Sequence, residues 1–186
     1  MTSVAGTTLR RETYPPALIA IHWFTAVLIA AVFAAIELRV YFPKGSDPRD
    51  QLKALHFMLG LTVLLLVIVR IFLRSQTRAP QIVPRPSAWQ TGAAHAMHAA
   101  LYAAMIAMPV LGWLILSGEG KPIPFFGLTL PPLIAEKKDL AKQIEGVHEY
   151  IGNALYFLIG FHALAALAHH YLQKDNTLLR MLPRGR

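Results

Sequence analysis

Four apolar blocks restrict the folds that are open to this chain of 186 residues. Each block is about 20 residues long, the length of helix that crosses the hydrocarbon core of a bilayer. The blocks lack the alternation of apolar and polar residues that marks a strand of a membrane β-barrel. The sequence therefore predicts transmembrane helices over residues 17–36, 52–73, 93–116 and 147–172.

The overall composition agrees with a membrane protein built as one domain. The chain is 55% hydrophobic and only 15% charged, whereas a soluble domain carries about 25% charged residues. No linker or repeat divides the sequence, so residues 1–186 are expected to form a single transmembrane domain. The predicted fold class is all-α, an integral membrane four-helix bundle.

Four histidines lie inside these predicted helices or at their ends. An ionisable side chain in a spanning helix costs a few kcal/mol on insertion scales, so by default it marks a functional site. Neutral imidazole is also the usual axial ligand of haem iron. The four residues are His22, His56, His148 and His162.

The depths and faces of these histidines predict two pairs. His148 and His162 lie about 21 Å apart along a helix axis and within about 40° of the same face. Because successive helices alternate in direction, His56 can face His148 at one end of the bundle, and His22 can face His162 at the other. A lone histidine at a helix end is more often interfacial than a ligand. Four at matched depths favour two stacked bis-histidine sites, a known use of bundle interiors.

A small residue follows each of these histidines by four positions. Position i+4 lies one turn along the same helix face, where a flat macrocycle bound to the imidazole would press on the helix. These small residues are Ala26, Gly60, Gly152 and Ala166.

Cysteine content and charge exclude other classes of function. The chain has no cysteine, which excludes iron–sulfur clusters, thiolate metal sites and the covalent attachment of c-type haem. Any haem must therefore be held non-covalently. The net charge of +8 is spread over short loops rather than along a basic stripe, so membrane lipid is an expected partner and nucleic acid is not.

Other polar residues are candidates for supporting roles. Arg70 and Arg74 can reach the membrane interface or pair with a haem propionate. His95 and His98 lie at positions i and i+3 of the third predicted helix and fit a ligand pair, a proton relay or interfacial residues. The role of His170 also stays open.

Five segments resemble the bacterial cytochrome b561 family, over nearly the whole chain. They are IHW at 21–23, ELRVYFP at 37–43, VRIFLR at 69–74, FGLTLP at 126–131 and HHYLQKDNTLLRMLPR at 169–184. The resemblance implies a four-helix membrane protein with two b haems. It also implies that the iron ligands are His22, His56, His148 and His162.

Within that family the chain is most similar to members that oxidise superoxide and pass the electrons to ubiquinone. The resemblance implies a bacterial inner (cytoplasmic) membrane location, with superoxide reacting near an outer haem on the periplasmic side. The distribution of Lys and Arg slightly favours cytoplasmic termini. Basic residues on the opposite side can steer a small anion. The candidates are Arg39, Lys53, Lys137 and Lys138.

Ubiquinone would accept electrons near the inner haem. Quinone reduction consumes protons, and His169, Lys174 and Asp175 are candidates for quinone contact or proton delivery. A protein partner is not required, because the loops are too short for a large docking platform. Two other functions stay open. One is an electron-transfer subunit that links a dehydrogenase or hydrogenase partner to quinone, and the other is a non-redox channel or transporter with a histidine relay.

Overall fold

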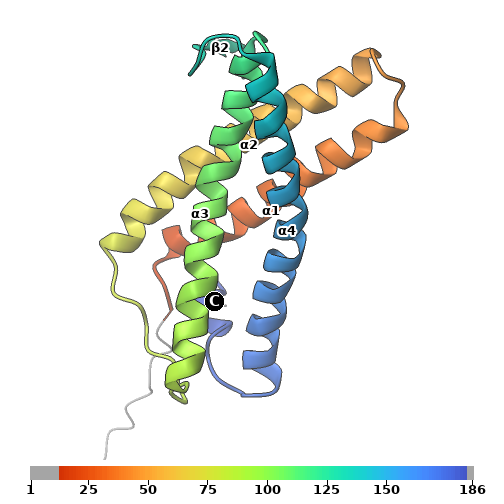
Figure 1. The fold of residues 1–186 in the computed structure, drawn as a ribbon. Coiled ribbons are helices and arrows are strands. Elements are labelled where there is room, and N and C mark those ends of the chain that lie inside the picture. Colours follow the sequence, from red (N-terminus) through yellow and green to blue (C-terminus); the bar gives the residue numbers. More distant parts are fainter. Residues whose placement is uncertain (1–12, 184–186) are drawn as a thin grey trace, which may run out of the picture.

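The computed structural model describes residues 13–183 and is built from four long helices (Figure 1). Helix α1 spans Pro16–Leu38, α2 spans Asp47–Ser75, α3 spans Ala88–Gly118 and α4 spans Lys138–Tyr171. Each helix is long and apolar enough to cross a membrane. The all-α fold predicted from the four apolar blocks is therefore confirmed.

Three of the helices, α2, α3 and α4, begin at least five residues before the predicted blocks. Helix α4 starts at Lys138 rather than near residue 147, because its polar first turns escape a hydropathy criterion but are helical. Helix α2 starts at Asp47, with Pro48 in its first turn. Proline is tolerated there, since its missing N–H would have no partner inside the helix. The acids Asp47 and Asp50 also favour this position through the helix dipole.

A short antiparallel hairpin follows α3, which the sequence analysis did not predict. Its strands are β1 (Ile123–Phe125) and β2 (Leu128–Leu130). The turn between them is Phe126-Gly127, and both residues have positive φ, 46° and 86°. Such backbone suits a two-residue turn, in which glycine is favoured. Ile123 is buried against α2 and α3, so the hairpin covers one end of the bundle.

The four helices form two helical hairpins. Helix α1 packs along α2, α3 packs along α4, and α2 contacts α3 between them. Helix α4 approaches α1 and α2 much less closely. Figure 1 shows the α1–α2 hairpin crossing the α3–α4 hairpin obliquely. Closely packed helices lie about 8–10 Å apart, so this wider spacing leaves an interior that side chains of α1, α2 and α4 share.

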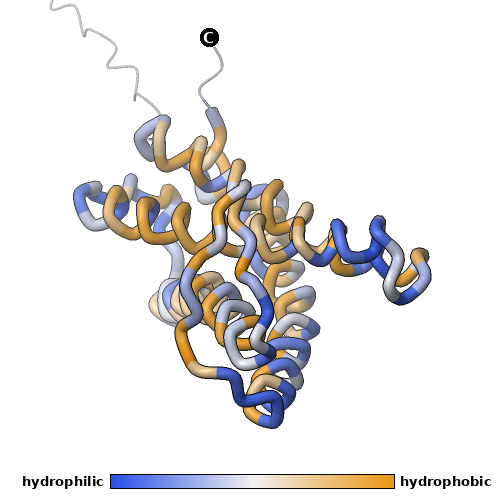
Figure 2. Tube along the Cα trace, turned by 90° about the horizontal axis from the view of Figure 1, so that it is seen from above, coloured by the Kyte–Doolittle hydropathy of each residue, from blue (hydrophilic) through white to orange (hydrophobic). Residues whose placement is uncertain are grey.

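The outside of the helices is apolar. Large side chains such as Phe24, Phe72, Phe157 and Phe161 are more than half exposed. Figure 2 shows hydrophobic residues along the helices and hydrophilic residues concentrated near their ends. Soluble proteins rarely expose apolar surface on this scale. These side chains are therefore expected to contact lipid.

Both ends of the described chain lie at the same end of the bundle. The amide of Tyr14 donates to the carbonyl of Arg180 at 3.0 Å, and the indole nitrogen of Trp23 donates to the carbonyl of Met181 at 2.7 Å. We call this end the termini side and the opposite end, which carries residues 39–46 and the β-hairpin, the far side.

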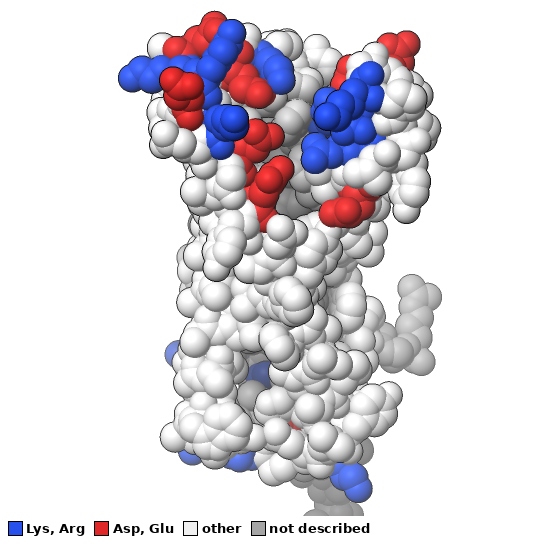
Figure 3. Space-filling model, turned by 45° about the vertical axis from the view of Figure 1, so that its right-hand side comes forward, with Lys and Arg blue, Asp and Glu red and all other residues white. Residues whose placement is uncertain are grey.

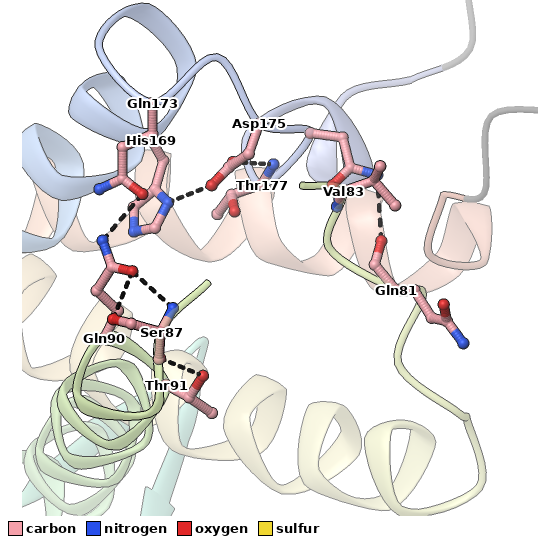
Figure 4. A network of polar contacts seen from close by, with 10 residues as sticks. Gln81, Val83, Ser87, Gln90, Thr91, His169, Gln173, Asp175 and Thr177 are labelled. Carbon is pink, nitrogen blue, oxygen red and sulfur yellow. Dashed lines mark hydrogen bonds and ion pairs between the residues drawn. The ribbon is translucent and has the colours of Figure 1, made fainter. Parts of the chain in front are cut away.

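The C-terminal segment, residues 172–183, is hydrogen-bonded to the loop before α3 and to the first turn of α3 (Figure 4). The side chain of Asn176 accepts a hydrogen bond from the amide of Val83 at 2.9 Å. The side-chain amide of Gln90 donates to Gln173 at 3.0 Å. These bonds satisfy polar groups that would otherwise have to face the membrane surface without partners.

Asp175 anchors the same segment to α4. Its Oδ2 lies 2.5 Å from Nδ1 of His169, and its Oδ1 accepts a hydrogen bond from the amide of Thr177 at 2.8 Å. Burial by itself would raise the pKa of Asp175, but the hydrogen bonds from His169 and Thr177 together lower the pKa by more than burial raises it. The pKa therefore lies below its ordinary value of 3.8.

This contact predicts a loss of stability in acid. A carboxyl whose pKa is depressed in the folded state stabilises the fold above its unfolded-state pKa, and the contribution is lost as pH falls through the folded value. We expect the unfolding temperature of the protein in detergent micelles to fall below about pH 4, and to fall less steeply in Asp175→Asn. Asp139→Asn, which changes an exposed acid at the start of α4, serves as the control. Identical pH profiles for all three proteins would contradict the role given to Asp175.

Candidate functional site

The structure brings His56 of α2 and His148 of α4 together near the far side. Their ring centroids are 6.2 Å apart and the ring planes meet at 70°. Two imidazoles on one metal ion have centroids about 6 Å apart, because a metal–nitrogen bond is about 2.0 Å and each nitrogen lies about 1.1 Å from its ring centroid. The spacing of this pair, the far-side pair, therefore suits one iron ion between the rings.

Small groups surround the far-side pair. Nδ1 of His56 lies 3.0 Å from the carbonyl oxygen of Val32, which keeps a proton on Nδ1 and leaves Nε2 free for a metal. A Cβ at Gly112 of α3 would lie 3.7 Å from Cε1 of His148, so this ring packs directly against α3. A Cβ at Gly60 would meet no described atom within 4 Å. The face one turn after His56 is thus open, as contact with a macrocycle requires.

His22 of α1 and His162 of α4 form the termini-side pair. Their ring centroids are also 6.2 Å apart, with the planes at 74°. His98 of α3 joins them, with its ring centroid 5.5 Å from that of His162. The two pairings expected from helix depth and face are therefore present in space, and the structure places His98 beside one of them. Iron ligation by these residues stays a prediction.

Arg70 contacts the termini-side pair directly. Its Nη1 lies 2.8 Å from Nδ1 of His22, and its Nε donates to the hydroxyl of Tyr102 at 3.1 Å. A guanidinium group only donates, so Nδ1 of His22 is the acceptor and the ring proton sits on Nε2. If Nε2 held iron, the ring proton would sit on Nδ1, which could then no longer accept from Arg70, and a haem propionate would give Arg70 another acceptor. Arg70 is therefore well placed to pair with a haem propionate.

Arg74, the other propionate candidate, is engaged at the membrane surface. Its Nη1 donates to the carbonyl of Thr77 at 2.7 Å, and its guanidinium lies 5.6 Å from the ring centroid of Tyr14. These contacts fit the snorkelling alternative. The structure does not bring Arg74 to the histidine pairs.

The quinone candidates lie together on the termini side. His169 and Asp175 bind each other at 2.5 Å, and Figure 4 shows both within the polar network of the C-terminal segment. Lys174 adjoins them in the sequence and has a positive φ of 56°. An acid and a histidine in hydrogen-bond contact can hand on a proton, which suits the function expected of them.

A cavity of about 1050 Å³ lies at the same end of the bundle, formed by the start of α1 and the end of the C-terminal segment, and the quinone candidates do not line it. Its lining includes Tyr14, Ile19, Trp23 and Leu182. The ring of Trp23 meets that of His22 edge-on, with centroids 5.3 Å apart. A mainly apolar cavity of this size can hold a small organic molecule. Only the ring of Trp23 would separate such a molecule from His22 of the termini-side pair.

Charged side chains on the far side gather in two groups with a hollow between them (Figure 3). Among the steering candidates, Lys53 pairs with Asp50 at 3.1 Å and Lys138 pairs with Glu136 at 3.1 Å. Exposed pairs of this kind are weak, so both lysines remain available to an anion. Lys137 immediately precedes α4, whereas Nε of Arg39 is buried and has no hydrogen-bond partner among the described residues.

The sequence analysis missed several residues of these sites. Tyr102 follows His98 by four positions and so shares its helix face, a signal that was available. Val32 contributes only a carbonyl oxygen, which no side-chain pattern reveals. Trp23 and Tyr14 were expected to belong to an interfacial belt, which aromatic residues near helix ends suit equally well.

Paired imidazoles restrict the chemistry of these sites. Among residues 13–183, no group of three or more His, Cys, Asp or Glu side chains lies close enough to hold a metal ion. A site with two imidazoles and no further protein ligand suits iron in a macrocycle, which supplies the remaining nitrogens. The spacing of the rings and the open face at Gly60 both fit haem.

Comparison with known proteins identifies the family. The sequence model of prokaryotic cytochrome b561 matches residues 13–184. Cytochrome b561 homolog 1 of Escherichia coli (strain K12) is 42% identical over 164 residues, which cover 88% of this chain and 93% of the relative. The probable superoxide oxidase CybB of Yersinia pestis is 41% identical over 168 residues, 90% of this chain and 94% of the relative. Cytochrome b561 homolog 2 of Escherichia coli (strain K12) is 30% identical over 172 residues, 92% of each chain. This chain therefore belongs to the prokaryotic cytochrome b561 family of multi-pass membrane proteins that carry b-type haem.

Proposed function

We propose that this cytochrome binds two b haems, oxidises superoxide on the far side and passes the electrons to ubiquinone on the termini side. The observation that carries the proposal is the presence of two imidazole pairs, each with ring centroids 6.2 Å apart. Helix α4 supplies one histidine to each pair, and the two lie about 21 Å apart along its axis. Two redox centres at these depths would connect the two faces of a bilayer.

The proposed ligands are His56 and His148 for the outer haem, and His22 and His162 for the inner haem. When bound, haem b supplies a one-electron couple at iron. Two histidines would hold each iron and leave no open position on the metal, which favours electron transfer over chemistry that needs one. Superoxide would therefore give up its electron at the edge of the site rather than by binding iron.

The stoichiometry requires protons on one side only. Two superoxide ions lose one electron each and become two molecules of dioxygen, while one ubiquinone gains two electrons and two protons and becomes ubiquinol. Lys53, Lys137 and Lys138 on the far side would raise the local concentration of the anion. The far side is then the periplasmic side, and both termini are cytoplasmic.

The termini side offers what quinone reduction needs. The cavity beside Trp23 suits an apolar head group next to the inner haem. His169 and Asp175 form a buried hydrogen-bonded pair at the same end of the bundle, and with Lys174 they are our candidates for quinone contact or proton delivery. The relative that is named a probable superoxide oxidase supports this direction of electron flow.

An electron-transfer subunit for a dehydrogenase or hydrogenase is the second candidate function. It uses the same two haems and the same quinone site, but electrons would arrive from a protein at the far side. The charged groups on either side of the far-side hollow would then face that partner. Reaction with superoxide separates the two functions.

Replacement of each proposed ligand tests the haem sites. His56→Ala, His148→Ala, His22→Ala and His162→Ala should each lower the haem content of the purified protein from about two to about one per chain, because one axial bond is lost. His170→Ala, which changes a histidine near the end of α4 that packs on Tyr171, should keep both haems. Pyridine haemochrome assays with protein quantification measure the ratio. Full haem content in all four variants would refute the assignment.

Rapid mixing of the oxidised protein with superoxide tests the electron donor. We expect fast haem reduction that slows as ionic strength rises, since steering of an anion is screened by salt. Lys53→Gln should reduce the rate and weaken its salt dependence, whereas Arg78→Gln on the termini side should not. Haem reduction no faster than that of an unrelated bis-histidine cytochrome would favour the subunit function instead.

Reoxidation of the reduced haems by a short-chain ubiquinone tests the acceptor site. His169→Ala should slow it by about a hundredfold, the usual scale of lost proton transfer, while haem content stays the same. Asp175→Asn keeps a hydrogen-bonding side chain without the negative charge and should also slow the reaction. His170→Ala is the neighbouring control. Unaltered kinetics in both variants would remove His169 and Asp175 from the quinone site.

A further inference from the structure

Arg39 has an unsatisfied group in an otherwise well-bonded part of the far side. It is the first residue of the short 3-10 helix η1 (Arg39–Tyr41), which follows α1. Its Nε is buried and has no hydrogen-bond partner among the described residues. A buried donor that belongs to a charged group and has no acceptor costs free energy. The complete protein is therefore expected to supply an acceptor at this position.

The position of Arg39 is fixed by its neighbours. Nη1 of Arg49, in the first turn of α2, donates to the carbonyl of Arg39 at 3.0 Å and to the carbonyl of Phe42 at 2.9 Å. These two bonds tie the end of α1 to the start of α2. The backbone of Arg39 is thus held between α1 and α2, the helices that also contribute Val32 and His56.

Arg39 lies near the α1 face that contacts His56. The carbonyl of Val32, which contacts His56, comes seven residues before Arg39, and seven residues return a helix to within about 20° of the same face. Arg39 is also close enough to His56 for the two charges to interact. It therefore lies about two turns beyond the Val32–His56 contact, toward the membrane surface.

The nearby carboxylates of the chain have other partners. Glu37 accepts a hydrogen bond from the hydroxyl of Tyr156 at 2.9 Å, and Asp50 pairs with Lys53 at 3.1 Å. A haem propionate is a carboxylate, and arginine binds carboxylates through its planar set of donors. On the other side of the bundle, Arg70 lies beside the termini-side pair and contacts His22.

We propose that Arg39 binds a propionate of the outer haem and raises the midpoint potential of that haem, rather than acting only as a surface charge that steers superoxide. The inference rests on the proposed placement of the outer haem between His56 and His148. Reduction adds one negative charge to the haem, and a fixed cation at its edge favours the reduced form. Arg39 is a positioning residue in this account, because it acts through the haem.

Redox titration of the purified dihaem protein, followed by absorbance, tests the proposal. The outer haem is the component that is lost in His148→Ala. Arg39→Gln should lower the midpoint potential of the outer haem by an amount that corresponds to a tenfold change in equilibrium, 59 mV for a one-electron couple. Arg39→Lys keeps the charge but not the Nε donor and should give a smaller shift. Lys44→Gln removes an exposed charge from the same loop and is the matched control.

The possible outcomes each support or overturn the role proposed for Arg39. Selective loss of the outer haem from Arg39→Gln but not from Lys44→Gln would also support the proposal. The midpoint potential of the outer haem would then be measured in Arg39→Lys instead. Equal potentials in Arg39→Gln and Lys44→Gln, with both haems bound, would overturn it. A slower, less salt-dependent reaction with superoxide without a shift in potential would identify Arg39 as a steering charge and would likewise overturn it. A protein that holds both haems but is not reduced by superoxide would contradict the proposed function. The shift in midpoint potential would still test the role of Arg39 in that protein.

Discussion

An imidazole inside a bilayer needs a partner where water cannot supply one, and the arrangement of α4 reflects this need. Its two histidines lie on one face at different depths, and each meets a histidine from α1 or α2. Helix α4 therefore stands away from those two helices and packs along α3 instead. The oblique crossing of the two helical hairpins keeps open the interior that the rings share.

The main features of this arrangement follow from the sequence, because they depend on simple periodicities. Length and hydropathy predict the four helices, and the turn of the helix together with alternating direction predicts which histidines meet. Features that depend on tertiary contacts do not follow in this way. Three such features are the contact of Arg70 with His22, the position of His98 beside His162 and the carbonyl of Val32 at His56. Each depends on how two helices pack, which residue spacing within one helix does not reveal. The β-hairpin was missed because short strands carry little hydropathy signal. The polar first turns of α4 were expected to be helical but lay outside the predicted span for the same reason.

The surroundings of the two imidazole pairs differ in a way that matters for electron flow. The termini-side pair lies against Arg70 and His98, whereas the far-side pair lies against a backbone carbonyl and the bare face of Gly112. Hydrogen bonds and charges around a haem set its potential. Two haems in these surroundings are therefore expected to differ in potential, and such a difference gives electron transfer a preferred direction.

The place of α4 in the chain also bears on how the protein is assembled. This helix follows the other three in the chain, yet it carries one histidine of each pair. A chain that has inserted only its first three helices contains His22 and His56 without their partners, and so offers no complete site to free haem. With the ligation proposed above, both haem sites would be complete only after α4 has entered the membrane. A chain without α4 in place would then be unable to hold haem between two histidines.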